Sequence, residues 1–131
     1  MGEALYSLLE VESGNVVIEN LHVADTFWKQ VVGLLGKRGL GDSEGLWIEP
    51  CNGVHTFGMR FEIDLLFLDK SGLAVHKALH VKPWRICGPI WGTRVVVEMP
   101  AGALVRGNIR PGRHYIKIPR EQGRPLRESS R

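Results

Sequence analysis

The sequence predicts a mainly β (α+β) fold, namely a small antiparallel β-sandwich or barrel-like domain with one α-helix near residues 26–36. Three observations predict it. Apolar stretches of strand length recur between turns rich in Gly, Pro, Asn and Asp, and only one stretch has helical periodicity. The 131 residues are also the size of one domain. We therefore expect a single β-rich domain over residues 1–119 and a basic, flexible tail over residues 120–131.

The first third of the chain predicts two strands and the helix. Residues 5–11 and 16–23 are apolar, and Ser13-Gly14-Asn15 between them is typical of a tight turn. Asp25 and Thr26 are good N-cap residues, and apolar side chains follow them at helical spacing. The glycine at position 36 and those shortly after it end this helix.

The rest of the chain predicts strands. The segments with the length and composition of strands are residues 45–49, 55–68, 73–81, 94–99 and 113–118. Alternation in the long second segment places His55, Phe57 and Met59 on the face that we expect to be buried, and Thr56 on the other face. In the third segment the same alternation predicts a core-facing side formed by Leu73, Val75, Leu79 and Val81.

Composition and charge exclude several classes of protein. The chain is 44% hydrophobic and 24% charged, which is typical of a globular protein and not of disorder, collagen or a coiled coil. No apolar run approaches the ~20 residues of a membrane-spanning helix. The net charge is +3, and the last twelve residues hold four arginines and two glutamates, which supply two of these charges. We therefore expect no nucleic-acid partner, because the basic excess lies on the tail and not on the domain.

The cysteine content and the N-terminus predict a cytoplasmic protein with reduced thiols. Two cysteines are too few for a disulfide framework, and the N-terminal residues lack the basic and apolar regions of a signal peptide. The chain also has no phosphate-binding loop, no dinucleotide-binding glycine motif and no Cys-x-x-Cys pair. We expect no cofactor.

Asp64 is the residue that fits its surroundings least. It lies in residues 63–68, which are otherwise apolar on both faces, as in a strand that is covered on both sides. A buried carboxylate is costly unless it is paired. Either an arginine or backbone N–H groups satisfy Asp64, which is the interpretation we favour, or a raised pKa makes it a proton-transfer group.

Cys51, His55 and Met59 suggest two further kinds of site. Thiolate, imidazole and thioether together suit copper(I) or zinc, but four positions of a strand span ~13 Å, so we expect no metal site. A turn after Cys51 could instead bring its thiol to His55 as a nucleophile and its base. A buried and unreactive cysteine is the simpler alternative.

Two other features leave alternatives open. Glu98 follows three valines and shares a face with Arg94, which predicts a surface salt bridge; the other possibility is a second acid that faces Asp64 across a cleft. Trp84, Ile86, Ile90 and Trp91 are concentrated in one loop rich in Pro and Gly. We expect them to be buried at one end of the sandwich, whereas exposed side chains would form a docking patch.

The order of motifs resembles a prokaryotic family known as domain of unknown function 192. The resemblance covers about residues 16–118. Its motifs are Ala24-Asp25-Thr26, Gly33-Leu34-Leu35-Gly36, Gly45-Leu46-Trp47-Ile48, His55-Thr56-Phe57-Gly58-Met59, Ile63-Asp64-Leu65-Leu66-Phe67-Leu68-Asp69, Pro83-Trp84-Arg85, Glu98-Met99-Pro100-Ala101-Gly102 and Arg110-Pro111-Gly112. It implies a mainly β domain with one helix, no established activity, and signature positions at His55, Met59, Asp64 and Glu98. The family often has an arginine before Gly-Leu-Leu, where this chain has Gln30-Val31-Val32.

The sequence therefore predicts a non-catalytic binding or accessory module for a small molecule or a protein, with a cleft near His55, Met59 and Asp64. The predicted ligand-binding residues are His55, Met59, Asp64, Glu98, Trp84 and Arg85. The alternative is a small hydrolase or lyase in which Asp64 and His55 transfer protons and Cys51 is the nucleophile.

Overall fold

The computed structural model describes residues 6–24, 41–121 and 124–125, so the predicted helix near residues 26–36 lies outside the described residues. The elements are β1 (Tyr6–Glu10), β2 (Asn15–Ala24), β3 (Glu44–Ile48), β4 (Val54–His55), β5 (Ile63–Leu68), β6 (Ala74–Val81), β7 (Ile86–Cys87), β8 (Val95–Pro100), α2 (Ala103–Arg106), β9 (Tyr115–Glu121) and β10 (Arg124–Pro125). The mainly β fold class is confirmed. Part of the expected tail extends β9 and forms β10.

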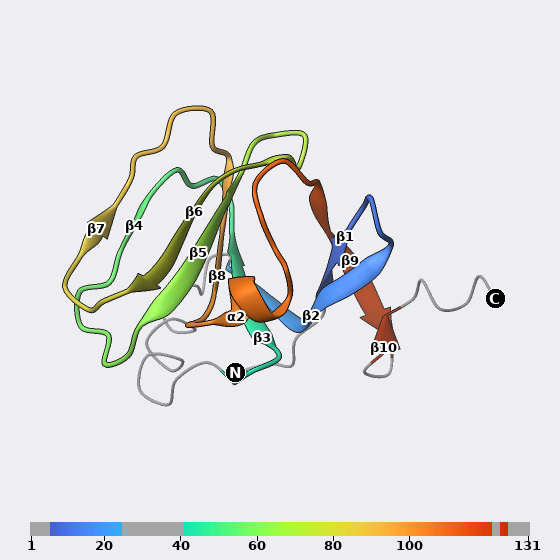
Figure 1. Cartoon of the computed structure of the whole chain (residues 1–131), viewed down its shortest axis with the longest axis horizontal. Helices are drawn as coiled ribbons and strands as arrows, with labels where there is room; N and C mark the ends of the chain where they lie inside the picture. Colours follow the sequence, from blue (N-terminus) through green and yellow to red (C-terminus); the bar gives the residue numbers. More distant parts are fainter. Residues whose placement is uncertain (1–5, 25–40, 122–123, 126–131) are drawn as a thin grey trace.

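The strands form one large sheet and one small sheet (Figure 1). The order in the large sheet is β10-β9-β1-β2-β3-β8-β5-β6, and β4 pairs with β7 beside it. All pairs are antiparallel except β2 and β3, which are parallel. This pair departs from the predicted antiparallel arrangement. A parallel pair requires a connection of a dozen or more residues, and the chain between Ala24 and Glu44 has that length.

The turn between β5 and β6 contacts the start of β9, which curls the large sheet. The Tyr115 N–H donates to the carbonyl oxygen of Gly72 at 2.9 Å, and Leu73 forms a bridge with His114. Gly72 has a φ of +90°, and a Cβ there would lie 2.9 Å from the Tyr115 carbonyl oxygen, so this contact requires glycine. The sheet does not close into a barrel, because each of the described edge strands β6 and β10 pairs on one side only.

Two neighbouring strands of the large sheet, β5 and β8, are buried on both faces, as the apolar sequence of residues 63–68 predicts for β5. The first core lies against α2, β1 and β9, and Leu66, Val97 and Tyr115 belong to it. The second core includes Ile63, Leu65, Phe67 and Val96, and the segments around β4 and β7 pack on it. Each fully buried Leu or Phe side chain contributes about 2 kcal/mol to folding, so these strands dominate the stability of the domain.

Two predictions about strands are wrong. Residues 55–68 are not one strand, since β4 ends at His55 and β5 begins at Ile63. A turn that includes Gly58 at a φ of +84° separates them, and the predicted alternation is lost. In β6, Val75 and Leu79 are exposed rather than core-facing. The pairing of β6 with β5 has register shifts, so a simple period of two does not describe this edge strand.

Candidate functional site

Thr56 joins two segments that are about thirty residues apart in the sequence. It is fully buried, and its hydroxyl donates to the Lys82 carbonyl oxygen at 2.7 Å and accepts the Arg85 N–H at 2.9 Å. Its backbone N–H donates to the Arg85 carbonyl oxygen, and its carbonyl oxygen accepts the Trp84 N–H. The His-Thr-Phe-Gly-Met and Pro-Trp-Arg motifs of the sequence therefore form one unit.

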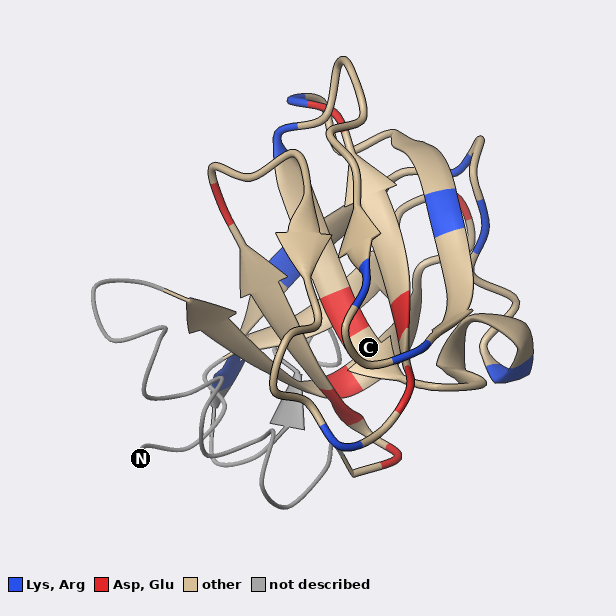
Figure 2. Cartoon of the chain, turned by 90° about the vertical axis from the view of Figure 1, so that its left-hand side faces the viewer, with Lys and Arg blue, Asp and Glu red and all other residues tan. Residues whose placement is uncertain are grey.

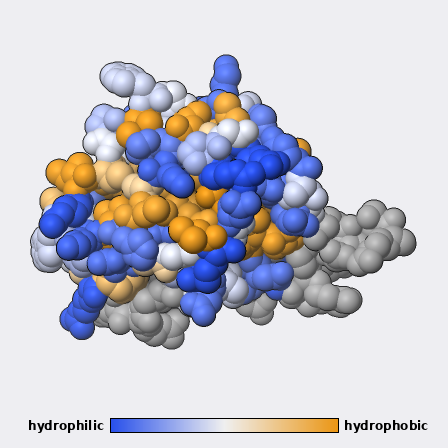
Figure 3. Space-filling model, in the orientation of Figure 1, coloured by the Kyte–Doolittle hydropathy of each residue, from blue (hydrophilic) through white to orange (hydrophobic). Residues whose placement is uncertain are grey.

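This unit presents an exposed cluster that we name the aromatic patch, formed by His55, Phe57, Trp84 and Ile86. The His55 and Phe57 rings lie 4.9 Å apart between centroids, and Phe57 stacks on Trp84 at 5.6 Å with 27° between the planes. Ile86 is paired with His55 across β4 and β7. Phe57 is 48% exposed, Trp84 64% and Ile86 72%. Hydrophobic groups appear among hydrophilic ones on the side of the molecule that carries β4 and β7 (Figure 3).

The backbone at Trp84 has an unusual conformation. Its φ is +65°, which lies in the left-handed region of backbone conformations. Residues other than Gly, Asn and Asp rarely adopt this region. The hydrogen bond from its N–H to Thr56 holds it there. Such conformations cost about 1–3 kcal/mol and are concentrated at functional sites. The strain here places a large exposed ring beside Phe57.

Basic residues flank the aromatic patch. Arg60, Lys82 and Arg85 are exposed, and no acidic side chain of the described residues forms an ion pair with any of them. The nearby carboxylate of Glu62 lies 3.2 Å from His80 Nδ1 instead. Seen from this side, Lys and Arg lie mostly on the loops, whereas several acidic residues lie within the strands (Figure 2).

The expectation that the Trp-rich loop is buried is wrong. Trp91 is 90% exposed, and Trp84 and Ile86 are also exposed, while Ile90 is half-buried against the second core. The loop is anchored by hydrogen bonds to residues 52 and 56 and does not fold over the end of the sheet. These backbone hydrogen bonds hold the loop in place while the rings of Trp84 and Trp91 stay exposed.

Asp64 is held by three backbone N–H groups. It is fully buried; Oδ1 accepts the His80 N–H at 2.9 Å, and Oδ2 accepts the N–H groups of Gly102 and Leu104 at 3.0 and 3.1 Å. The interpretation of a carboxylate satisfied by backbone N–H groups is therefore confirmed. Asp64 connects β5 to β6 and to the start of α2.

Glu98 lies on the face of the sheet that carries the second core, where its neighbours across the strands are Leu46 and Leu65. It is 7% exposed, and burial raises its pKa to about 7. Both predictions for it are wrong. Arg94 pairs with Glu49 at 3.3 Å and not with Glu98, and Glu98 does not face Asp64, which projects from the other face.

The structure does not bring Cys51 and His55 together as a nucleophile and base. The Cys51 thiol donates to the Gly53 carbonyl oxygen at 3.1 Å, and His55 Nδ1 accepts the Phe57 N–H. Burial, with a smaller effect from the charge of Glu98, raises the pKa of the Cys51 thiol. Met59 is half-buried against the second core. Within the described part of the chain, no group of three or more His, Cys, Asp or Glu could hold a metal ion.

Two of the hollows that are lined by described residues lie elsewhere on the molecule. One, of about 450 Å³, lies between the β1–β2 hairpin and the loop that follows α2. The other, of about 250 Å³, lies between the β5–β6 turn, the end of β3 and β9. Neither is lined by His55, Met59 or Asp64, the residues around which the sequence predicts a cleft.

The sequence did not indicate two buried polar features of the structure. It placed Thr56 on the outer face, although Thr56 is the buried centre of the unit. The second feature is the buried hydrogen bond of 3.2 Å from the Tyr115 hydroxyl to the Glu10 carboxylate, which no local sequence pattern predicts. A glycine two residues after Thr56 could have indicated that the strand ends there.

A family model and two related sequences match this chain, and the activity of that family is uncharacterised. Residues 9–116 match the model of the family DUF192, described as "Uncharacterized ACR". A UPF0127 protein of Thermococcus sibiricus is 29% identical over 102 residues, which are 74% of this chain and 65% of that protein, so the chain spans about two thirds of this relative. A UPF0127 protein of Pyrococcus horikoshii is 33% identical over 106 residues, which are 76% of this chain and 88% of that protein.

Two crystal structures share the fold. A protein of unknown function from Novosphingobium aromaticivorans has a TM-score of 0.69 and 21% identity, with 87% of this chain and 84% of that chain covered. A Sinorhizobium meliloti protein described as a candidate transcription regulator has a TM-score of 0.70 and 18% identity, with 88% and 94% covered. Among the described residues, no helix is long and apolar enough to cross a membrane.

Proposed function

We propose that this chain, which belongs to the DUF192 family of uncharacterised proteins, is a non-catalytic binding module that docks an acidic and apolar segment of a partner protein on its aromatic patch. The observation that carries the proposal is the exposure of four adjacent large side chains on a rigid base, His55, Phe57, Trp84 and Ile86. A contiguous exposed apolar patch with polar surroundings is typical of an interaction site.

The chemistry of the patch supports a protein partner. Trp and Arg are enriched among the residues that dominate binding energy in protein interfaces, and Trp84 and Arg85 are adjacent here. The Arg85 guanidinium donates to the Pro83 carbonyl oxygen at 3.4 Å, which holds it against the backbone next to Trp84. Rings that are held in place lose little entropy when they bind.

The charges of the patch support an acidic partner. Arg60, Lys82 and Arg85 lack acidic partners among the described residues, so they are available to carboxylates of another chain. Charge complementarity of this kind increases the association rate and selects the partner. Of the predicted ligand-binding residues, His55, Trp84 and Arg85 contact the partner, and Asp64 has a structural role.

A second class of ligand fits part of this chemistry. Single-stranded nucleic acids stack bases on aromatic rings and bind basic residues, and one structural neighbour is described as a candidate transcription regulator. The aliphatic Ile86 and the small number of basic residues favour a protein segment instead. We also propose that binding occurs in the cytoplasm, which the two free thiols Cys51 and Cys87 support.

The test is selection of peptides from a random library on the full chain, followed by titration of the selected peptides. We expect peptides that combine aromatic and acidic residues, and at least ~10-fold weaker binding to Trp84→Ala and to Arg85→Glu. Trp91→Ala is the matched control, since Trp91 is the more exposed ring and makes no ring contact with the patch. Equal loss in Trp91→Ala, selection of basic peptides, or binding of single-stranded oligonucleotides in place of peptides would overturn the proposal.

A further inference from the structure

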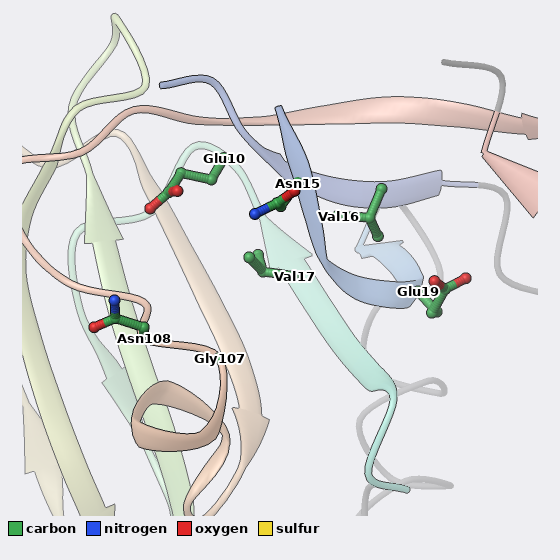
Figure 4. A pocket seen from close by; sticks show the side chains of 7 residues that line it. All are labelled: Glu10, Asn15, Val16, Val17, Glu19, Gly107 and Asn108. Carbon is green, nitrogen blue, oxygen red and sulfur yellow. The ribbon is translucent and has the colours of Figure 1, made fainter. Parts of the chain in front are cut away.

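The hollow of about 450 Å³ lies at a distance from the aromatic patch, between the β1–β2 hairpin and the loop after α2 (Figures 1 and 4). Its size is within the range of small-molecule sites in proteins. The lining residues are Glu10, Asn15, Val16, Val17, Glu19, Gly107 and Asn108. They include two carboxylates, two amides and no cationic side chain, so the lining complements a positively charged ligand.

Glu10, the last residue of β1, is the most buried carboxylate that lines this hollow. It is 8% exposed, and its register partners on the two neighbouring strands are Asn15 and Tyr115, so the three side chains share one face of the sheet. Its Oε2 accepts the Tyr115 hydroxyl at 3.2 Å. Its Oε1 accepts no hydrogen bond from the described part of the chain. Oε1 is therefore the carboxylate oxygen of Glu10 that is available to a ligand in the hollow.

The opposite wall is also fixed in place. The Tyr115 hydroxyl accepts the Arg110 N–H at 3.0 Å, which attaches the loop after α2 to the floor of the hollow. Asn108 has a φ of +53°, and its side chain and that of Glu10 extend into the same space (Figure 4). The Arg110 guanidinium, the neighbouring cation, donates to the Asn108 carbonyl oxygen at 3.0 Å.

We propose that this hollow binds a small organic cation that carries one or two ammonium groups, such as an aliphatic diamine. One ammonium group donates to Glu10 Oε1, and the amide oxygens of Asn15 and Asn108 accept its other N–H groups. Val17 contacts the aliphatic part of the ligand. The site is independent of the aromatic patch and does not depend on the function proposed for it.

The test is titration of the full chain with diaminobutane, followed by NMR or calorimetry. Butanediol and butanedioate, which have the same carbon chain and are neutral and anionic, are the control compounds. Glu10→Gln removes the charge but keeps an acceptor for Tyr115, and Asn108→Gly removes the amide while glycine suits the positive φ. Glu62→Gln, which removes the carboxylate 3.2 Å from His80 Nδ1, is the control variant.

We expect saturable binding of diaminobutane with chemical-shift changes at Glu10, Asn15 and Asn108, and no binding of the two control compounds. Glu10→Gln should weaken binding by at least ~10-fold, because an ammonium–carboxylate hydrogen bond is lost, and Asn108→Gly should weaken it by ~3-fold. Glu62→Gln should bind as the unmodified chain does. Absence of diaminobutane binding, equal binding by butanediol or butanedioate, or unchanged binding by a folded Glu10→Gln variant would each overturn the proposal.

Discussion

Asp64 and Glu98 lie on the paired strands β5 and β8, but their side chains project from opposite faces of the sheet. Asp64 is opposite Met99 in the register and Glu98 is opposite Leu65, so the side chains of the two acids point into different cores. Asp64 accepts hydrogen bonds from three backbone N–H groups. Burial raises the pKa of Glu98 instead. The two carboxyl groups therefore cannot share a proton or a ligand, and each needs its own test.

Replacing Asp64 with Asn should destabilise the domain strongly. The Asn amide has one oxygen for three N–H donors, and its NH2 group cannot accept from the remaining ones. Loss of charge-assisted hydrogen bonds at a buried site predicts a fall of about 3 kcal/mol in the free energy of unfolding. Urea denaturation measures it. Asp42→Asn, at an exposed position, should change the free energy by less than about 0.5 kcal/mol, and an equally small change in Asp64→Asn would contradict the structural role.

Glu98 should make the stability of the domain depend on pH. Its pKa is about 7 in the folded chain against 4.5 ordinarily, so the folded state binds the proton more tightly than the unfolded state. The stabilisation is complete below about pH 4.5 and is lost as the pH rises through about 7. This difference corresponds to about 3 kcal/mol. Denaturation curves between these pH values should show the decline in the unmodified chain and a much flatter profile in Glu98→Gln. Parallel profiles would exclude Glu98 as the cause.

Cys51 should react slowly with thiol reagents, and Glu98 should contribute to the slowness. Burial raises the pKa of the Cys51 thiol and the charge of Glu98 raises it further, so little thiolate is present at neutral pH. Alkylation at pH 8, followed by mass spectrometry in a Cys87→Ser background, should be slower than for a free cysteine and faster once Glu98→Gln is added. In a Cys51→Ser background, Cys87 should not respond to Glu98→Gln, because burial alone raises its pKa. A response of both thiols would indicate a general loosening of the second core.

The sequence predicts the parts of this molecule that depend on local patterns. The apolar run of residues 63–68 predicts a strand buried on both faces, and the structure has this strand. A carboxylate in such a strand requires hydrogen-bond donors, and backbone N–H groups donate to Asp64 in the structure. The segment from His55 to Phe61 is different, because long-range hydrogen bonds from Thr56 to the chain near Arg85 determine its conformation. Alternation along one segment cannot reveal partners thirty residues away. The exposure of Trp84 follows from the same contacts.

Replacing Thr56 with Val should loosen the aromatic patch. Valine has the same shape but no hydroxyl, so the Lys82 carbonyl oxygen and the Arg85 N–H lose their partner in a buried site. We expect the free energy of unfolding to fall by about 2 kcal/mol. The strained φ of Trp84 also loses support, so the stacking of Phe57 on Trp84 should weaken. Nuclear Overhauser contacts between the two rings measure this stacking.

Thr56→Ser is the control for this change, because it keeps the hydroxyl and removes only a methyl group. It should retain the ring contacts and lose about 1 kcal/mol, the contribution of one buried methyl group. If Thr56→Val keeps the contacts between Phe57 and Trp84 as well as Thr56→Ser does, the backbone hydrogen bonds between residues 56 and 84–85 suffice to hold the patch. Loss of the contacts in Thr56→Val alone would establish the buried hydroxyl as the group that orients the exposed rings.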